Sequence, residues 1–241
     1  MSVSAIVAAA GEGKRMGSLG NKQLLLLAGK PVLAHTLEVL ESSELVDEVV
    51  LLAPETLVES YRTRVVDAFG FRKVRDIIPG GRERQDSVWK GLEAIDPEGD
   101  LVLIHDGARP FVTGDLIRRV VDAARSFGAA GAAVPVKDTV KRVGPDMVIL
   151  ETPPRDCLWL MQTPQVFSCR LLARAYREAL EAGFRGTDDS MLVERLGVPV
   201  HVVPGSYENI KITTPGDLVV AEAILAEREK RSGDGSGRDR L

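Results

Sequence analysis

Residues 4–23 read SAIVAAAGEGKRMGSLGNKQ, an uncharged apolar run followed by a glycine-rich loop. The apolar run is typical of a strand that a sheet covers on both faces. In the loop, glycines let backbone N–H groups close on an anion, and Lys14, Arg15 and Lys22 add positive charge. This combination predicts a triphosphate-binding loop that follows the first strand of an α/β sheet.

The same alternation of apolar runs and amphipathic stretches continues along the chain. We expect buried strands at residues 4–10, 48–53, 101–105, 129–136 and 200–203, and helices at 32–40, 57–69, 87–95, 116–127 and 171–180. Because strands and helices alternate, the pattern predicts the α/β class, with a single Rossmann-like, mostly parallel sheet and helices on both of its faces.

The domain is expected to span residues 1–229. Thr214-Pro215-Gly216-Asp217 is a helix start signal, with a hydroxyl at the N-cap, a proline at the first position and an acid at the third. We expect this last helix to end at about Glu229. Residues 230–241 have little to bury, which predicts a disordered C-terminal tail.

One segment interrupts the alternation. Residues 139–143 and 147–151 suit two strands around a turn at 144–146, with no helix to pack them. A two-stranded arm is marginal in water, so we expect this arm, at about residues 138–155, to protrude and to lie on a second copy of the chain as a dimerisation element.

Composition bounds the function. The chain has 241 residues, 27% of them charged, and a formal net charge of −4, which argues against a nucleic-acid partner because such proteins carry a large basic face. No apolar run is long enough to cross a bilayer, no secretory segment precedes the first strand, and two cysteines are too few for a disulfide framework. These features favour a cytoplasmic protein that has no membrane partner.

Ligands of open parallel sheets bind beyond the carboxyl ends of the strands, so residues directly after each strand are candidates. Besides the glycine-rich loop, these positions hold Gly80, Gly81, Arg82, Asp86 and Ser87, then His105 to Pro110, and finally Asn209 and Lys211 in a segment 210–213 that alternates like a strand. Cations, glycine pairs and one well-placed acid suit phosphates and a divalent metal.

The loop differs from two familiar phosphate motifs. A Walker loop needs Gly-x-x-x-x-Gly-Lys-Ser/Thr, but Met16 stands five residues after Gly11, and Ser18 follows Gly17. A dinucleotide fingerprint needs Gly-x-Gly-x-x-Gly, whereas the glycines here are spaced Gly-x-Gly-x-x-x-Gly. The loop therefore favours a nucleoside triphosphate over a pyridine dinucleotide.

Several polar residues allow two interpretations. Asp106 could ligate Mg²⁺ or form an ion pair with Arg109, Arg109 could bind a phosphate or only that carboxylate, and Lys211 could be a solvated lysine. The pair Asp188-Asp189 could bind a second metal but more often opens a helix. Structural roles are favoured for His35, His201, Cys157 and Cys169, because no Cys/His pair has metal-ligand spacing.

In combination these blocks resemble the 2-C-methyl-D-erythritol 4-phosphate cytidylyltransferases, which make a CDP-alcohol from CTP and release pyrophosphate in the non-mevalonate isoprenoid pathway. The likeness runs from about Ser4 to Ala226. It is carried by residues 9–17, 22–23, 80–88, 105–110, 135–139, 162–165, 187–189 and 209–211. One departure is Asn21, which stands where this family usually has proline.

The resemblance implies a role for each matching residue. Catalytic roles fall to Arg15, Lys22, Arg155 and Lys211; nucleotide binding to Ala9, Ala10, Gly11, Gly13, Gly81, Ser87 and Asp106; acceptor binding to Arg109, Thr139, Arg155 and Lys211; and the divalent metal, Mg²⁺ or another, to Asp106. It also implies a homodimer with shared active sites, in which Thr139 and Arg155 reach the partner's acceptor.

This chemistry needs no special nucleophile. The second pKa of a phosphate monoester is about 6, so the acceptor is largely dianionic at neutral pH and attacks without a general base. A cytidylyltransferase acting on ribitol 5-phosphate is the nearest alternative. A short-chain NAD(P) oxidoreductase is a remote one, since Tyr207 and Lys211 fit Tyr-x-x-x-Lys, and a non-catalytic nucleotide sensor is a third.

Overall fold

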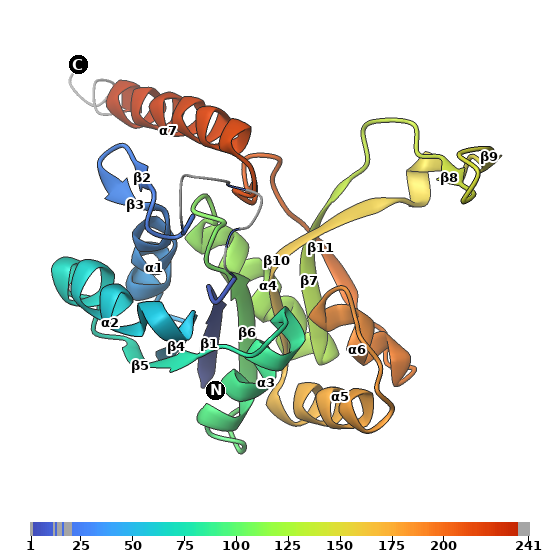
Figure 1. Ribbon diagram of the computed structural model, residues 1–241, viewed down its shortest axis with the longest axis horizontal. Coiled ribbons are helices and arrows are strands. Elements are labelled where there is room, and N and C mark those ends of the chain that lie inside the picture. The colour runs from blue at the N-terminus through green and yellow to red at the C-terminus, as the bar shows by residue number, and fades with distance from the viewer. Residues whose placement is uncertain (1, 12, 14–15, 17–20, 236–241) are drawn as a thin grey trace.

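The computed structural model describes residues 2–11, 13, 16 and 21–235. Within these residues the main sheet has seven strands in the order β11-β7-β10-β6-β1-β4-β5 (Figure 1). Its strands are β1 (Val3–Ala8), β4 (Glu48–Ala53), β5 (Val74–Pro79), β6 (Leu101–Asp106), β7 (Ala129–Pro135), β10 (Trp159–Ser168) and β11 (His201–Pro204). All pairs are parallel except those made by β10. The expected mostly parallel α/β sheet is confirmed.

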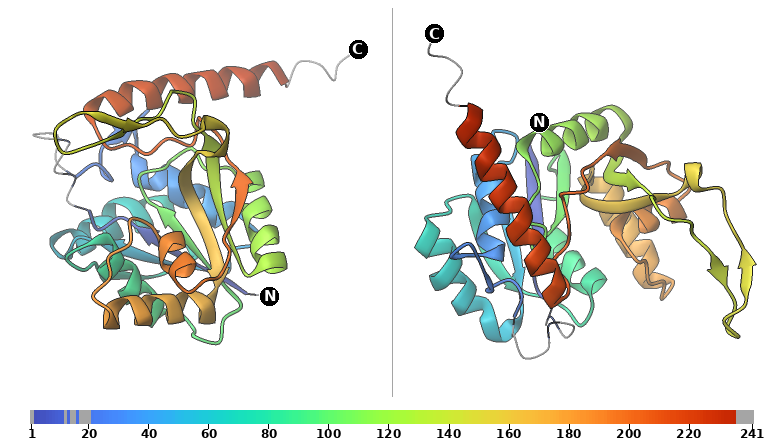
Figure 2. Two further views of the ribbon diagram at one scale, coloured as in Figure 1. Left: turned by 90° about the vertical axis from the view of Figure 1, so that its right-hand side faces the viewer. Right: turned by 90° about the horizontal axis from the view of Figure 1, so that it is seen from above.

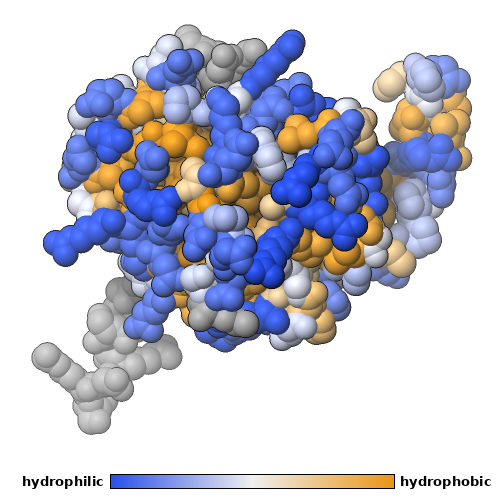
Figure 3. All heavy atoms as spheres, turned by 90° about the horizontal axis from the view of Figure 1, so that it is seen from below, coloured by the Kyte–Doolittle hydropathy of each residue, from blue (hydrophilic) through white to orange (hydrophobic). Residues whose placement is uncertain are grey.

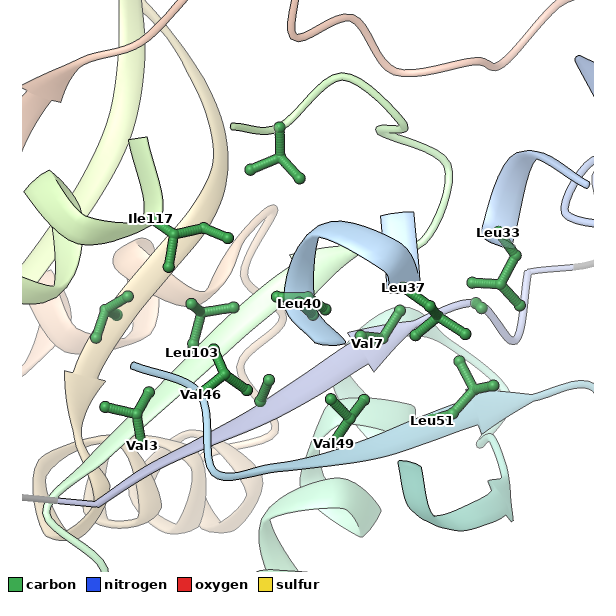
Figure 4. Close-up of a cluster of buried hydrophobic side chains, with 14 of the residues drawn as sticks. Val3, Val7, Leu33, Leu37, Leu40, Val46, Val49, Leu51, Leu103 and Ile117 are labelled. Carbon is green, nitrogen blue, oxygen red and sulfur yellow. The ribbon is translucent and has the colours of Figure 1, made fainter. Parts of the chain in front are cut away.

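Helices cover both faces of this sheet (Figure 2). One face packs against α1 (Val32–Ser42), α4 (Gly114–Phe127) and α2 (Val58–Tyr61), which continues into a π-helical segment, Arg62–Asp67. The other face packs against α3 (Arg84–Ala94), α5 (Cys169–Glu181) and α6 (Asp189–Arg195). Figure 4 shows the hydrophobic core on the face that α1 covers, where Leu33 and Leu37 of α1 lie against Val7 and Leu51 of the sheet.

The sequence of α4 explains its position. Leu116, Ile117, Val120, Val121 and Ala124 form its buried face. The Thr113 hydroxyl accepts the Leu116 N–H at 3.2 Å, and Gly128, at φ 84°, ends the helix in a left-handed conformation that glycine adopts without strain. Phe127 is half exposed and stacks on His201 at 3.7 Å between ring centroids.

The reversed strand β10 determines where the arm leaves the body. β7 ends and β10 begins at the same edge of the sheet, with Pro135 opposite Trp159. Between them the chain forms β8 (Arg142–Val143) and β9 (Ile149–Glu151), an antiparallel pair, and a 3-10 turn, Arg155–Cys157. Figure 1 shows this arm projecting away from the sheet, as its sequence predicted.

The arm exposes apolar side chains along most of its length. Val143, Met147, Val148, Ile149 and Leu150 are all exposed, Met147 by 83%. Figure 3 shows hydrophobic atoms gathered on this projection. An exposed apolar patch of this kind is typical of a surface that contacts another protein.

Two strands of the main sheet were not predicted. β5 carries Arg75 and Asp76 because it is an edge strand, so its sequence lacks a continuous apolar run. β10 contains Gln162, Thr163 and Gln165. The Thr163 hydroxyl accepts the Asp106 N–H at 3.0 Å, and the Gln165 amide donates to Asp188 at 2.8 Å. The expected strand at 210–213 is wrong: Ile210 and Ile212 pack beneath α7, and the Ile212 N–H donates a single 2.9 Å bond to Ala108.

The last helix is longer than expected. α7 (Pro215–Gly235) passes Glu229, so residues 230–235 are helical and not part of a disordered tail. Arg231 explains the extension, since it pairs with Glu227 one turn earlier at 3.5 Å and with Glu208 at 3.2 Å. The remainder of the expected tail, residues 236–241, lies outside the described residues.

A small hairpin, β2 (Leu26–Leu27) and β3 (Lys30–Pro31), lies near α7.

Candidate active site

A cavity of about 590 Å³ opens at the carboxyl ends of β1 and β6. The site residues expected from the sequence that line it are Ala10, Gly11, Gly13, Lys22, Gly81, Ser87, Asp106 and Lys211. They come from four separate segments of the chain. The folded sheet therefore brings together most of the residues predicted to bind the nucleotide.

Gly81 lines this cavity, and neither Gly81 nor the preceding Gly80 has room for a side chain. A Cβ on Gly80 would lie 2.2 Å from the Ala10 methyl, and one on Gly81 would lie 2.4 Å from Asp86 Cβ. The Ser87 hydroxyl accepts the Gly81 N–H at 2.9 Å and donates to Glu83 O at 2.9 Å. The glycine pair is thus fixed where its backbone can approach a ligand closely.

Asp106 is the most strongly coupled charge in the site. Its carboxylate lies 2.9 Å from Lys211 Nζ, 3.3 Å from Arg109 Nε and 3.5 Å from Arg84 Nε. Burial alone would raise the pKa of this carboxyl group. The three cations outweigh burial and hold its pKa well below the ordinary value, so Asp106 is an anion throughout the neutral range.

Arg84 is a site residue that the sequence did not single out. Its guanidinium makes a bidentate pair with Asp189, at 3.0 and 2.7 Å, while Asp189 also accepts from the buried Tyr176 hydroxyl. Asp189 is fully buried, so Arg84 is held in one orientation beside Asp106. Gly80 and Gly81 mark this segment of the sequence as a candidate. Asp189, which orients Arg84, is 105 positions away, so no local pattern connects the two residues.

A second cavity of about 210 Å³ adjoins the first. Arg109 and the middle of β10, with Gln162 and Thr163, line it together with Thr187 and Asp188. Arg84, Asp106 and Lys211 line both cavities. Arg109 thus lines this cavity while its Nε also contacts Asp106, so both interpretations of this arginine agree with the geometry.

Other predicted residues lie elsewhere. Ala9 is buried in the core and does not line either cavity among the described residues. Thr139 and Arg155 belong to the arm, where the exposed Arg155 donates to Lys137 O at 2.9 Å, and neither residue lines a described cavity of its own chain. Arg15 lies outside the described residues.

Several of these polar residues form hydrogen bonds within the fold. His35 Nε2 bonds to Leu27 O at 2.9 Å, and both cysteines are free thiols. Asp188 caps α6 by accepting the Met191 N–H at 3.0 Å. Within the described part of the chain, no group of three His, Cys, Asp or Glu side chains could hold a metal.

A divalent cation fits the site in one particular way. Mg²⁺ is commonly held by one or two carboxylates together with substrate phosphates, and Asp106 supplies one such carboxylate inside the larger cavity. A complete protein cage is not required for that mode of binding. The donor set is therefore suitable for a metal that arrives with a phosphate ligand.

His105, next to Asp106, is fully buried within the sheet. Burial lowers the pKa of its imidazole to about 4, and the Asp106 charge offsets this only in part. His105 is consequently neutral at physiological pH, and Nε2 lies 3.3 Å from Arg109 O.

None of the helices in the described regions is long and apolar enough to cross a membrane.

Comparisons with known proteins agree with this geometry. Residues 3–227 match the family described as IspD, 2-C-methyl-D-erythritol 4-phosphate cytidylyltransferase. The chain is 52% identical to the enzyme of that name from Geotalea uraniireducens over 93% of this chain and 97% of that one, and 50% identical to the one from Pelotomaculum thermopropionicum over 98% and 99%.

Solved structures show the same likeness. The 4-diphosphocytidyl-2C-methyl-D-erythritol synthase of Anaerococcus prevotii has a TM-score of 0.83 at 36% identity, covering 93% of this chain and 96% of that one. The 2-C-methyl-D-erythritol 4-phosphate cytidylyltransferase of Thermus thermophilus has a TM-score of 0.77 at 35% identity, covering 94% and 100%. Since the likeness extends over nearly the full length in both sequence and fold, the chain belongs to the IspD family, the 2-C-methyl-D-erythritol 4-phosphate cytidylyltransferases, and is a CTP-dependent enzyme of non-mevalonate isoprenoid synthesis.

Proposed function

We propose that the cavity of about 590 Å³ binds CTP and that the adjoining cavity of about 210 Å³ binds 2-C-methyl-D-erythritol 4-phosphate. The observation that carries this assignment is the wall shared by the two cavities. Arg84, Asp106 and Lys211 line both, so two bound substrates meet at these side chains. That is the place where CMP would pass from one to the other.

The transfer is a displacement at the α-phosphorus of CTP. An oxygen of the acceptor's phosphate forms the new P–O bond, the bond from the α-phosphorus to the bridging oxygen of the β-phosphate breaks, and pyrophosphate leaves with that electron pair. The attacking oxygen already carries negative charge, so no general base is needed. The protein's task is to align two polyanions and to stabilise the added charge.

Specific residues are suited to these tasks. We assign charge stabilisation at the α-phosphate to Lys22 and Arg15, and orientation of the acceptor to Arg109 and Lys211. Support comes from the position of Lys22 and Lys211 on the CTP cavity and of Arg109 and Lys211 on the acceptor cavity. Mg²⁺ held by Asp106 would supply further positive charge to the triphosphate.

The arm suggests a homodimer with shared active sites. Its apolar side chains are exposed, and Thr139 and Arg155 lie on a projection instead of at their own chain's described cavities. A partner chain that covers the arm would bury this surface and could receive both residues at its acceptor cavity. A cytoplasmic location is supported by the exposed free thiol of Cys157, which suits a reducing compartment.

Pyrophosphate release is the decisive assay. The enzyme is incubated with CTP and Mg²⁺, and with 2-C-methyl-D-erythritol 4-phosphate, ribitol 5-phosphate or no acceptor. We expect rapid release with the first acceptor and little with the others. Equal release with ribitol 5-phosphate would overturn the acceptor assignment, and CTP binding without any release would indicate a nucleotide sensor.

A further inference from the structure

Residues 21–24 form a tight turn that carries Lys22. The Asn21 carbonyl accepts the Leu24 N–H at 3.1 Å, and its side-chain Oδ1 accepts the Gln23 N–H at 3.0 Å. The side chain thus closes an Asx turn within a β-turn, and the two bonds span the backbone of Lys22. Lys22 itself is only 9% exposed and lines the larger cavity.

A buried tyrosine ties this turn to the sheet. Tyr61, at the end of α2, is fully buried, and its hydroxyl lies 3.0 Å from Asn21 Oδ1 and 3.0 Å from Ala9 O. Because a phenol has one hydrogen, the hydroxyl shares it between these two acceptors. Ala9 directly follows β1, so one hydroxyl connects the end of the first strand to the turn that carries Lys22.

The donor state of Tyr61 does not change with pH. Burial raises the pKa of its hydroxyl well above the ordinary value for tyrosine, and the hydrogen bond to Asn21 offsets this only in part. The hydroxyl therefore keeps its hydrogen throughout the neutral range. A fixed hydrogen-bond donor beneath a turn restrains the backbone from which a long, flexible side chain extends.

We propose that Asn21 and Tyr61 are positioning residues that hold the backbone of Lys22 so that its ammonium points at the α-phosphate of CTP. This inference rests on the proposed role of Lys22. Neither residue needs to touch the substrate: Asn21 fixes the turn, and Tyr61 fixes Asn21 relative to β1. Small displacements of a charge-stabilising group lower the rate strongly, since stabilisation depends on the geometry of the transition state.

The test compares Tyr61→Phe and Asn21→Ala with the control Tyr207→Phe. The control also removes a hydroxyl hydrogen bond, because the Tyr207 OH donates to Pro135 O at 2.7 Å. Tyr207, however, is half exposed and lines neither described cavity. We expect kcat to fall roughly ten- to a hundredfold in the first two variants, with KM for CTP within about twofold of wild type, and to stay unchanged in the control.

A double-mutant cycle separates positioning from a merely structural role. In a Lys22→Ala background, adding Tyr61→Phe should cause no further loss of kcat, because the side chain being positioned is gone. Losses that multiply in the double variant would overturn the proposal, as would an increase in KM for CTP with kcat unchanged. Thermal denaturation of each variant confirms that it is folded, and Asn21→Ala keeps the test informative if Tyr61→Phe is unstable.

The cycle also separates this inference from the proposed function. Wild-type kcat in Lys22→Ala would remove the catalytic role of Lys22 itself. A large loss in Lys22→Ala with wild-type kcat in both Tyr61→Phe and Asn21→Ala would leave that role intact and refute positioning alone.

Discussion

Lys22 and Asp106 are opposite charges on the same cavity, and they have different surroundings. Asp106 is ion-paired with Lys211, Arg109 and Arg84, whereas Lys22 extends from a turn fixed by hydrogen bonds. Replacing one of the cations around Asp106 would also remove a counter-charge from that buried carboxylate. Replacing Lys22, which lines the same cavity, tests stabilisation of the added charge on phosphorus while leaving these three ion pairs in place.

We expect Lys22→Ala to lower kcat by on the order of 10²- to 10³-fold, the usual cost of removing one preorganised charge-stabilising group. Folding should change little, because the backbone bonds of the turn do not involve the lysine side chain. Steady-state kinetics and circular dichroism check both statements. Wild-type turnover in this variant would contradict the catalytic assignment.

His105 gives a pH prediction. An unfolded histidine has a pKa of about 6.5, and that of the buried His105 is about 4, so between these values the unfolded chain binds a proton that the folded chain does not. The free energy of unfolding should therefore fall as pH drops from 6.5 to 4, by on the order of 3 kcal/mol. Asp106 contributes little to this change in stability. Its pKa is depressed, so the stability that its ionised form provides is lost mainly as pH falls below the ordinary carboxyl pKa.

Urea denaturation between pH 7 and pH 4.5 measures this dependence. His105→Gln should lose most of the slope. An unchanged slope in His105→Gln would assign the effect to other groups. His35, whose pKa burial also lowers, would be the first of these to examine.

At the scale of elements, the arm gives a direct test of shared active sites. If Arg155 serves the partner's site, an enzyme lacking Lys22 and an enzyme lacking Arg155 should complement each other. Mixed dimers of Lys22→Ala and Arg155→Ala chains would contain one site with both residues intact and one site lacking both. We expect the mixture to recover up to about a quarter of wild-type activity after random subunit exchange.

Two controls accompany this experiment. Each variant alone should remain nearly inactive, and a mixture in which both chains carry Lys22→Ala should recover nothing. Failure of the Lys22→Ala and Arg155→Ala mixture to recover activity, with subunit exchange demonstrated by mass, would show that the two residues do not complement each other in trans.

The elements differ in how well their sequences predicted them. β4 and β7 are continuous apolar runs because helices cover both faces, and their boundaries agree with expectation to within one residue. β5 and β10 carry polar residues for reasons of position, one at an edge and one beside the site, and a local pattern does not reveal position. The extension of α7 depends on Glu208, a residue outside the helix.

The candidate site shows the same division. Gly81, Ser87, Asp106 and Lys211 could be predicted because each lies in a short polar or glycine-containing segment next to an apolar run. Arg84 could not, since its orientation depends on a carboxylate 105 positions away. Nor could the link between Tyr61 and Asn21, because the tyrosine looks like an ordinary core residue of an amphipathic helix.

For the whole molecule, ligand binding should stabilise the native state. Both cavities are assembled from segments far apart in the chain, so CTP binds the folded state and has no comparable site in the unfolded chain. At a CTP concentration a hundred times Kd, the free energy of unfolding should rise by about 2.7 kcal/mol. Thermal shift assays with CTP and Mg²⁺, and with ATP and Mg²⁺ as the comparison, measure this effect. No dependence of Tm on CTP would contradict the binding assignment.

The reversed direction of β10 has a consequence for how such enzymes can diversify. β10 begins beside the end of β7, so the arm leaves and rejoins the sheet at neighbouring points. The Val136 N–H donates to Leu158 O at 3.0 Å across its base. Such an arm can grow, shrink or be exchanged without disturbing any register in the sheet. If the arm pairs subunits and binds the acceptor as proposed, both properties can change in evolution without altering the segments that line the larger cavity.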